Sequence, residues 1–275
     1  MALRSTKVVI VVLVAVAVVV GGVYGLRALW NTAKDHLTAD TCSIGAYELD
    51  PDQAVVASTM VGAVTKYRVN LPERAAVLAL AAGLQESKLT NLAPGQGDRD
   101  SVGVLQQRPS QGWGGGSAAK LTDVGEATKE FLDALMKIDN WQTMPLAEAI
   151  QAVQISADGS AYAQHEVEAQ TLADALQGRK PAAISCSFGK PTKVASPINV
   201  AAQVTTELGV SSATAVGSTV RVAGARWQTA AWFVAHADRY GIERVAYNGK
   251  VWTRSGGWTS STASAAAVTA TLYKL

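Results

Sequence analysis

The sequence has few of the residues that form metal sites. It contains two cysteines and three histidines, and the histidines, His36, His165 and His236, are far apart in the chain. None of them stands at the His-Glu-x-x-His spacing with which a helix binds zinc. The sequence therefore predicts no metal and no cofactor.

Charge is also scarce. Only 17% of the 275 residues are charged, and the net charge of +2 is too small to indicate a nucleic-acid partner. The chain has no Gly-x-Ser-x-Gly nucleophile elbow, which excludes one large class of hydrolases. Because 48% of the residues are hydrophobic, the chain can bury a substantial core, and its length suggests one or two domains.

One hydrophobic run stands out near the N-terminus. Val8 to Leu26 is uncharged and about as long as a helix that crosses a bilayer. Arg4 and Lys7 precede it, so the positive-inside rule places the N-terminus in the cytoplasm and the remainder outside the cell. The alternative is a cleaved signal peptide, although Gly21–Gly25 makes a poor cleavage site. We expect a retained single-pass anchor in residues 1–30, and either interpretation exports the rest.

Export from the cytoplasm allows a prediction of the oxidation state of the two cysteines. Cys42 and Cys186 bracket a long segment, and an oxidising compartment allows them to pair. A disulfide is the expected outcome, with a reactive thiol or a metal ligand as the alternatives. In a chain-entropy model, closing a loop of this size stabilises a domain by around 4 to 5 kcal/mol.

A buried helix leads to Glu86. Asn70 is the expected N-cap, with Glu73 as its capping-box partner and Pro72 in the first turn. From Ala75 to Leu84 the residues are apolar on every side, which is typical of a helix inside a core. Glu86 follows on the same face as small and apolar residues, so we expect its pKa to be raised, as a general acid requires.

The residues after Glu86 carry a resemblance to a known family. Glu86-Ser87 followed by Gly103-Val104-Leu105-Gln106 resembles the lytic transglycosylase and goose-type lysozyme superfamily. The longer string GDRDSVGVLQQRPSQGWG, residues 97–114, is similar to lysozyme-like domains of actinobacterial secreted and membrane-anchored proteins. The resemblance covers roughly Cys42 to Cys186, about half of the chain.

The resemblance implies a reaction and a set of site residues. It implies cleavage of the β-1,4 bond between N-acetylmuramic acid and N-acetylglucosamine in peptidoglycan, with Glu86 protonating the leaving oxygen. It also implies that Ser87, Gln106 and Gln107 bind or position the sugar. Tyr162 is a further candidate, because Ala161-Tyr162-Ala163 loosely matches a family pattern whose tyrosine contacts the catalytic carboxyl.

Other residues of the loop have two interpretations each. Asp98 and Asp100 are the nearest candidates for the second carboxylate that an inverting hydrolase needs, whereas a lytic transglycosylase needs none. The alternative is that Asp98, Arg99 and Asp100 form a hydrogen-bonded turn that stiffens the loop. Trp113 either stacks on a sugar ring or packs in the fold.

Periodicity and turn residues predict the remaining organisation. After a spacer at 31–41, the lysozyme-like domain spans 42–187, a linker rich in Lys, Pro, Thr and Ser spans 188–197, and a second domain spans 198–275. Further helices are expected at 51–67, 124–138, 146–155 and 165–177. In the second domain we expect helices at 199–208 and 226–240, strands at 218–222 and 268–273, and a hairpin turning at Asn248-Gly249.

The second domain looks like uncharacterised C-terminal domains of other actinobacterial cell-wall proteins. The similarity lies in Trp232, His236, Gly241-Ile242, Tyr247, Trp252 and Gly257-Trp258. Its tryptophans suggest either an exposed binding surface or core packing, and packing is the better expectation. We name no active site there.

Together these patterns predict a mainly α-helical lysozyme-like domain, preceded by one transmembrane helix and followed by a small α/β domain. The expected protein is a peptidoglycan lytic transglycosylase or muramidase at the cell membrane, with both domains extracytoplasmic. The alternative is a non-catalytic protein that binds peptidoglycan in a cell-wall, secretion or conjugation assembly and recruits a protein partner through its C-terminal domain.

Overall fold

A computed structural model describes residues 40–156, 159–224 and 226–274, which belong to one compact unit, Asp40–Leu275. The predicted membrane span, Val8 to Leu26, and the spacer that follows it up to residue 39 lie outside the described residues. Among the described helices, none is long and apolar enough to cross a membrane. The described residues therefore give no support to the predicted transmembrane fold class and single-pass membrane location: the longest described helix has 15 residues, and a span needs about 20.

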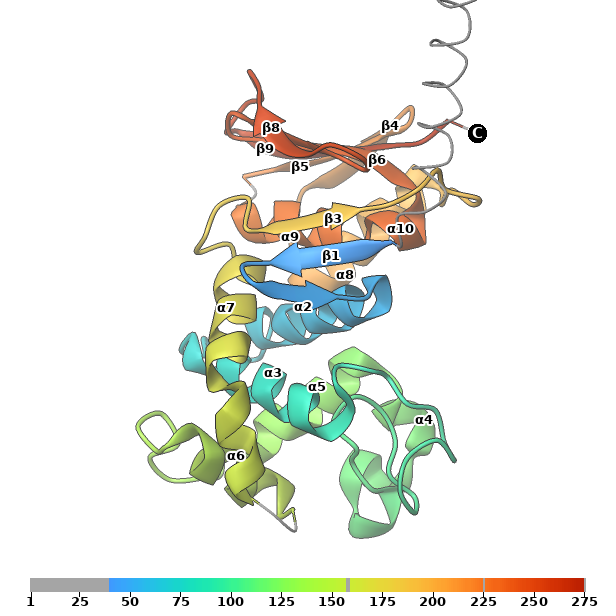
Figure 1. The fold of residues 1–275 in the computed structure, drawn as a ribbon. Helices are drawn as coiled ribbons and strands as arrows, with labels where there is room; N and C mark the ends of the chain where they lie inside the picture. Colours follow the sequence, from blue (N-terminus) through green and yellow to red (C-terminus); the bar gives the residue numbers. More distant parts are fainter. Residues whose placement is uncertain (1–39, 157–158, 225, 275) are drawn as a thin grey trace, which may run out of the picture. The chain divides into compact units, whose positions relative to one another are not determined.

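Five helices of more than one turn build the first part of the unit (Figure 1). They are α2 (Pro51–Thr65), α3 (Arg74–Ser87), α5 (Val124–Leu135), α6 (Leu146–Gln154) and α7 (Glu166–Leu176), with shorter turns α4 (Ala118–Leu121), η1 (Pro109–Gln111), η2 (Trp113–Gly116) and η3 (Gly159–His165). Every residue of α3 from Ala75 to Leu84 is buried, as its apolar sequence predicts. This helix is therefore the centre of the helical layer.

The start of α3 differs from its prediction. The N-cap is Glu73 rather than Asn70, and Pro72 precedes the helix instead of occupying its first turn. The cause is Pro72, because a residue before proline is disfavoured in the helical region and Leu71 would have been the first helical residue.

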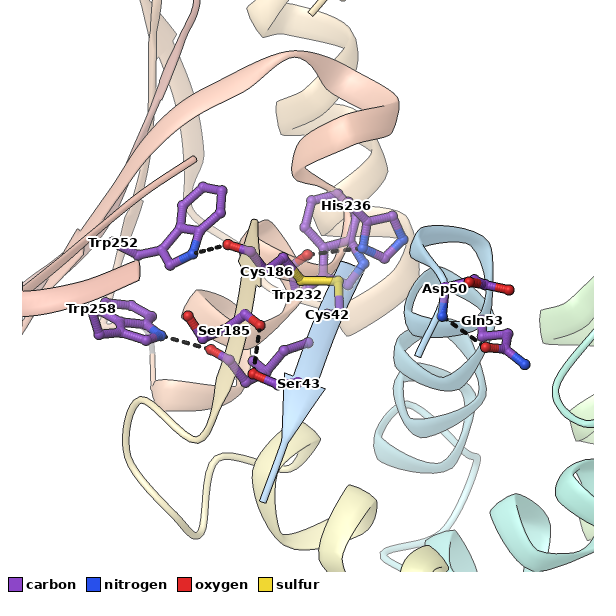
Figure 2. The surroundings of a disulfide bond; sticks show 11 residues. Cys42, Ser43, Asp50, Gln53, Ser185, Cys186, Trp232, His236, Trp252 and Trp258 are labelled. Atoms are coloured by element: carbon purple, nitrogen blue, oxygen red, sulfur yellow. Dashed lines mark hydrogen bonds between the residues drawn. A yellow bond between two sulfur atoms is a disulfide. The ribbon is translucent and has the colours of Figure 1, made fainter. Parts of the chain in front are cut away.

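A three-stranded antiparallel sheet joins the two ends of the predicted lysozyme-like segment. Its order is β2 (Tyr47–Leu49), β1 (Thr41–Ile44) and β3 (Ile184–Ser187). Cys42 lies opposite Cys186 in the register of β1 and β3, and the two form a disulfide, which confirms the predicted pairing (Figure 2).

The C-terminal part is built on a six-stranded antiparallel sheet. The strand order is β4 (Ala213–Val216), β5 (Thr219–Ala223), β9 (Ala267–Leu272), β6 (Ile242–Tyr247), β7 (Lys250–Thr253) and β8 (Gly257–Ser260). Three helices, α8 (Pro197–Leu208), α9 (Trp227–Ala235) and α10 (Ala237–Tyr240), lie between this sheet and the rest of the unit (Figure 1). The expected hairpin at Asn248-Gly249 is confirmed, with positive φ at both turn residues.

The predicted fold class is wrong in its balance of elements. About 45% of the described residues are helical and 19% lie in strands. The strands form two sheets, whereas the prediction placed strands only in a small C-terminal α/β domain. The strands β1, β2, β3, β4 and β8 were not predicted. They are at most four residues long, which is too short for a clear alternating pattern. In addition, β1 pairs with β3, about 144 residues further along the chain, so no local signal predicts that pairing.

The segment predicted as a linker is bound to the fold. The amide of Phe188 donates to the Arg254 carbonyl at 2.9 Å, and the amide of Ala195 donates to the Tyr240 carbonyl at 3.1 Å. The indole N–H groups of Trp252 and Trp258 donate to β3 carbonyls, at Cys186 (3.1 Å) and Ile184 (2.7 Å) (Figure 2). One hydrophobic core extends through both parts of the unit.

Candidate functional site

Glu86 is the penultimate residue of α3 and is half-buried. The helix ends because Lys88 and Leu89 both adopt left-handed backbone conformations, with φ of 53° and 58°. Their amides donate back to the carbonyls of Leu84 and Gly83, each at 3.0 Å. This C-cap turns the chain sharply just after Glu86 and fixes where its side chain projects.

Tyr162 of η3 binds Glu86. Its hydroxyl donates to Oε1 of Glu86 at 2.5 Å, although the two residues are 76 positions apart, and its ring is fully buried. Burial and the hydrogen bond to Glu86 raise the pKa of Tyr162, so the hydroxyl keeps its proton and remains a donor. The predicted contact between Tyr162 and Glu86 is therefore present.

Gln85 joins the same two segments and was not predicted. Its Oε1 lies 3.0 Å from Nε2 of His165 and accepts a hydrogen bond from Nε2 of Gln164 at 3.1 Å. Gln85 therefore fastens the end of α3 to the turn that carries Tyr162. Its partners are about 80 residues away, and a single sequence contains no signal for such a contact.

Ser87 positions the glutamine segment. Its hydroxyl donates to the Val104 carbonyl at 2.8 Å and accepts from the amide of Thr90 at 3.1 Å. Gln154, which was not predicted, donates to the neighbouring Leu105 carbonyl at 2.9 Å. The turn at Val104 and Leu105 is thus held by hydrogen bonds from α3 and α6.

The two predicted glutamines have different surroundings. Gln106 is half-buried, has φ of 47° and donates to the Gly103 carbonyl at 2.8 Å. Gln107 is only 2% exposed and donates to the Ala127 carbonyl of α5 at 3.2 Å, so its side chain is committed to the core. Gln106 remains the candidate for contact with a ligand.

The loop carboxylates lie in unequal environments. Asp100 accepts hydrogen bonds from Nε of Arg108 at 2.6 Å and from the amide of Ser110 at 2.8 Å. Hydrogen bonds from Ser110 and Arg108 hold the pKa of Asp100 far below its usual range, which makes it a weak base. The side chain of Asp98 is 91% exposed and lies 3.8 Å from Arg99. This geometry is that of a stiffened turn.

Aromatic residues proposed for sugar contact mostly pack inside the fold. Trp113 is half-buried and packs against the core. Trp232 and Trp252 are fully buried, while Trp227 packs edge-to-face against Trp258. His236 is also fully buried, and Asp238 pairs with Arg254 at 2.8 Å.

Two further observations bear on ligands. In the part of the chain that the structure describes, no three His, Cys, Asp or Glu side chains lie close enough to hold a metal ion. A groove of about 990 Å³ runs along α2, and Glu86 does not line it.

No model of a known protein family matches the chain, and no curated protein sequence matches it significantly.

Proposed function

We propose that this chain cleaves the β-1,4 bond between N-acetylmuramic acid and N-acetylglucosamine in peptidoglycan, with Glu86 as the general acid and base. The contact that carries the proposal is the hydrogen bond from the buried Tyr162 hydroxyl to Glu86 at 2.5 Å. The resemblance of residues 97–114 to lysozyme-like domains supplies the substrate class. The disulfide is consistent with the oxidising compartment in which such a substrate occurs.

Glu86 would supply and recover one proton. Tyr162 holds Oε1, so the proton transferred to the glycosidic oxygen comes from the opposite oxygen, Oε2. As that proton moves, the bond between the anomeric carbon and the leaving oxygen breaks. The 6-hydroxyl of the same sugar then attacks the anomeric carbon and gives its proton to Glu86, which restores the acid and leaves a 1,6-anhydro end.

The environments of the loop carboxylates favour this transglycosylase route. Hydrolysis with inversion requires a carboxylate that activates water. Asp100 is occupied by Arg108 and Ser110, and Asp98 lies exposed on the loop surface. A route that uses only Glu86 avoids the need for either one.

Mass spectrometry of peptidoglycan digested with the full chain tests the proposal. We expect anhydro-muramyl ends, and we expect Glu86→Gln to reduce their rate of formation by about 100- to 10,000-fold with the fold retained. Glu73→Gln is a matched control, because it neutralises an exposed glutamate at the other end of the same helix.

Two outcomes would contradict the proposal. Reducing ends in place of anhydro ends would indicate hydrolysis, with Asp98 or Asp100 as the candidate for the carboxylate that activates water. No cleavage by a folded, oxidised protein that still binds glycan would favour the non-catalytic binding function.

A further inference from the structure

The groove along α2 is a cavity that the proposed reaction does not use. Its volume is about 990 Å³, at the upper end of ligand sites in proteins. α2 lines it over its length, and the segments 89–91 and 122–126, with α8 and α10, complete the lining. The 15 residues of α2 span about 22 Å, which suits an extended chain better than a compact small molecule.

The charges that α2 and α5 contribute to the α2 groove are separated by sign. The starts of α2 and α5 are adjacent, because Asn91 beside α2 donates to the Thr122 carbonyl at 2.8 Å, and their ends are adjacent, because Tyr67 donates to Asp133 at 2.5 Å. The acidic residues near the starts are Asp50, Asp52, Asp123 and Glu126, and the basic residues toward the ends are Lys66, Arg68 and Lys129. Two further charged residues, Glu207 of α8 and Arg239 of α10, also line the groove, and Glu207 already accepts hydrogen bonds from Thr59 and Trp232.

Several of these charges are available to a ligand. Within the described ranges, neither Asp50 nor Asp52 takes part in an ion pair. Lys66 donates to the Thr206 carbonyl at 2.9 Å, which uses one of its three N–H groups. Asp133 pairs with both Arg68 and Lys129, and because it carries a single negative charge, this group keeps a net positive charge that adds to that of Lys66.

We propose that the α2 groove binds an extended peptide with an ammonium group at the acidic end and a carboxylate at the basic end. Amide side chains of Gln53, Asn91 and Gln203 line the groove and suit the hydrogen-bonding groups of a peptide backbone. In the described lining Tyr67 is the one aromatic residue and its hydroxyl is bound to Asp133, whereas a glycan needs aromatic faces for its sugar rings.

Naming the peptide rests on the proposed function. The stem peptides of peptidoglycan carry both a diamino-acid ammonium group and carboxylates, so they match the separated charges of the groove. The groove also adjoins the end of α3. Gln53 donates to the Lys88 carbonyl at 2.7 Å, two residues after Glu86, so an occupant of the groove touches a side chain that holds the catalytic turn.

Calorimetric titration of the full chain with the stem pentapeptide L-alanyl-γ-D-glutamyl-L-lysyl-D-alanyl-D-alanine tests the inference. Asp50→Asn combined with Asp52→Asn keeps the helix cap, because asparagine caps as well as aspartate, and should weaken binding about tenfold. Acetylation of the lysyl amine should weaken binding similarly. Glu166→Gln is the control, since it neutralises an exposed acid in the first turn of α7, outside the groove, and should leave affinity unchanged.

The failure of this inference can be separated from failure of the proposed function. No binding at millimolar peptide, or binding that neither change weakens, would overturn the inference even if peptide-free glycan is cleaved. Displacement of the peptide by chito-oligosaccharides would also overturn it and identify the groove as a glycan site. Absence of glycan cleavage by the unaltered chain, with peptide binding intact, would count against the proposed function alone.

Discussion

At the residue scale the hydroxyl of Tyr162 is the group whose removal is most informative. Tyr162→Phe keeps the buried ring and removes only the donor to Glu86. We expect the rate of glycan cleavage to fall about 10- to 100-fold, because a charge-assisted hydrogen bond contributes about 1.5 to 3 kcal/mol. Initial rates on peptide-free glycan measure this.

Tyr67→Phe is the matched control, because the Tyr67 hydroxyl also donates to a carboxylate, Asp133, at the same distance. Burial and Asp133 raise the pKa of Tyr67 to about 12, so its hydroxyl is likewise a constant donor. Both variants should lose similar stability, but only Tyr162→Phe should lose rate. Unchanged cleavage by Tyr162→Phe would remove the main support for Glu86 as the acid.

At the element scale the loop after Glu86 depends on one glycine. Gly103 has φ of +76°, and a Cβ placed there would lie 2.2 Å from the Leu121 carbonyl oxygen. Gly103→Ala should reduce the free energy of unfolding by about 3 kcal/mol, since backbone strain and a backbone clash add. Gly95→Ala is the control: its φ is +85° but nothing lies within 4 Å, so about 1 kcal/mol is expected. Urea denaturation measures both variants, and an equal loss of unfolding free energy in the two would contradict the packing of this loop on α4.

The helices and the hairpin could be predicted because their signals are local. Each signal spans only a few residues: the apolar run of α3, the glycine Gly178 just after α7, and the turn at Asn248-Gly249. The sheet β2-β1-β3 and the bond between Gln85 and His165 could not, because their partners come from distant parts of the chain. For the site, Glu86 and Tyr162 followed from resemblance, whereas the inward orientation of Gln107 depends on α5.

At the scale of the whole molecule, the two predicted domains pack as one unit. Arg254 of the C-terminal part is 7% exposed and donates to the carbonyls of Gly189 and Ala237 as well as to Asp238. Glu207 of α8 accepts hydrogen bonds from Thr59 of α2 and from Trp232 of α9, both at 2.9 Å. Composition changes along the chain indicated a linker, but composition cannot reveal these buried polar contacts across it.

The same contact region makes the stability of the whole unit depend on pH. His236 is fully buried, and its Nδ1 lies 2.8 Å from the Trp232 carbonyl. Its Nε2 lies 3.6 Å from Glu207 and has no hydrogen-bond partner among the residues that the structure describes. Burial lowers the pKa of His236 to about 4, against a smaller opposing effect of Glu207; Arg239 and Tyr240 of α10 are the other ionisable neighbours. The unfolded chain therefore binds a proton near pH 6.5, whereas the folded chain does so only near pH 4.

The sign of the effect follows from this difference. The contribution of His236 to the free energy of unfolding is complete above about pH 6.5 and is lost as the pH drops from there to about 4, by about 3 kcal/mol in total. His236→Phe keeps an aromatic ring against Trp232 and removes the titrating group, so its unfolding free energy should change less across this range. His165→Gln, which removes a less buried histidine of η3, should keep most of the slope. Urea denaturation at pH 7, 5.5 and 4.5 measures how steeply the free energy of unfolding falls with pH in each protein.

If His236→Phe loses stability as steeply as the unaltered chain, the prediction is wrong. Carboxylates would then be the groups that take up protons on unfolding and cause the acid sensitivity.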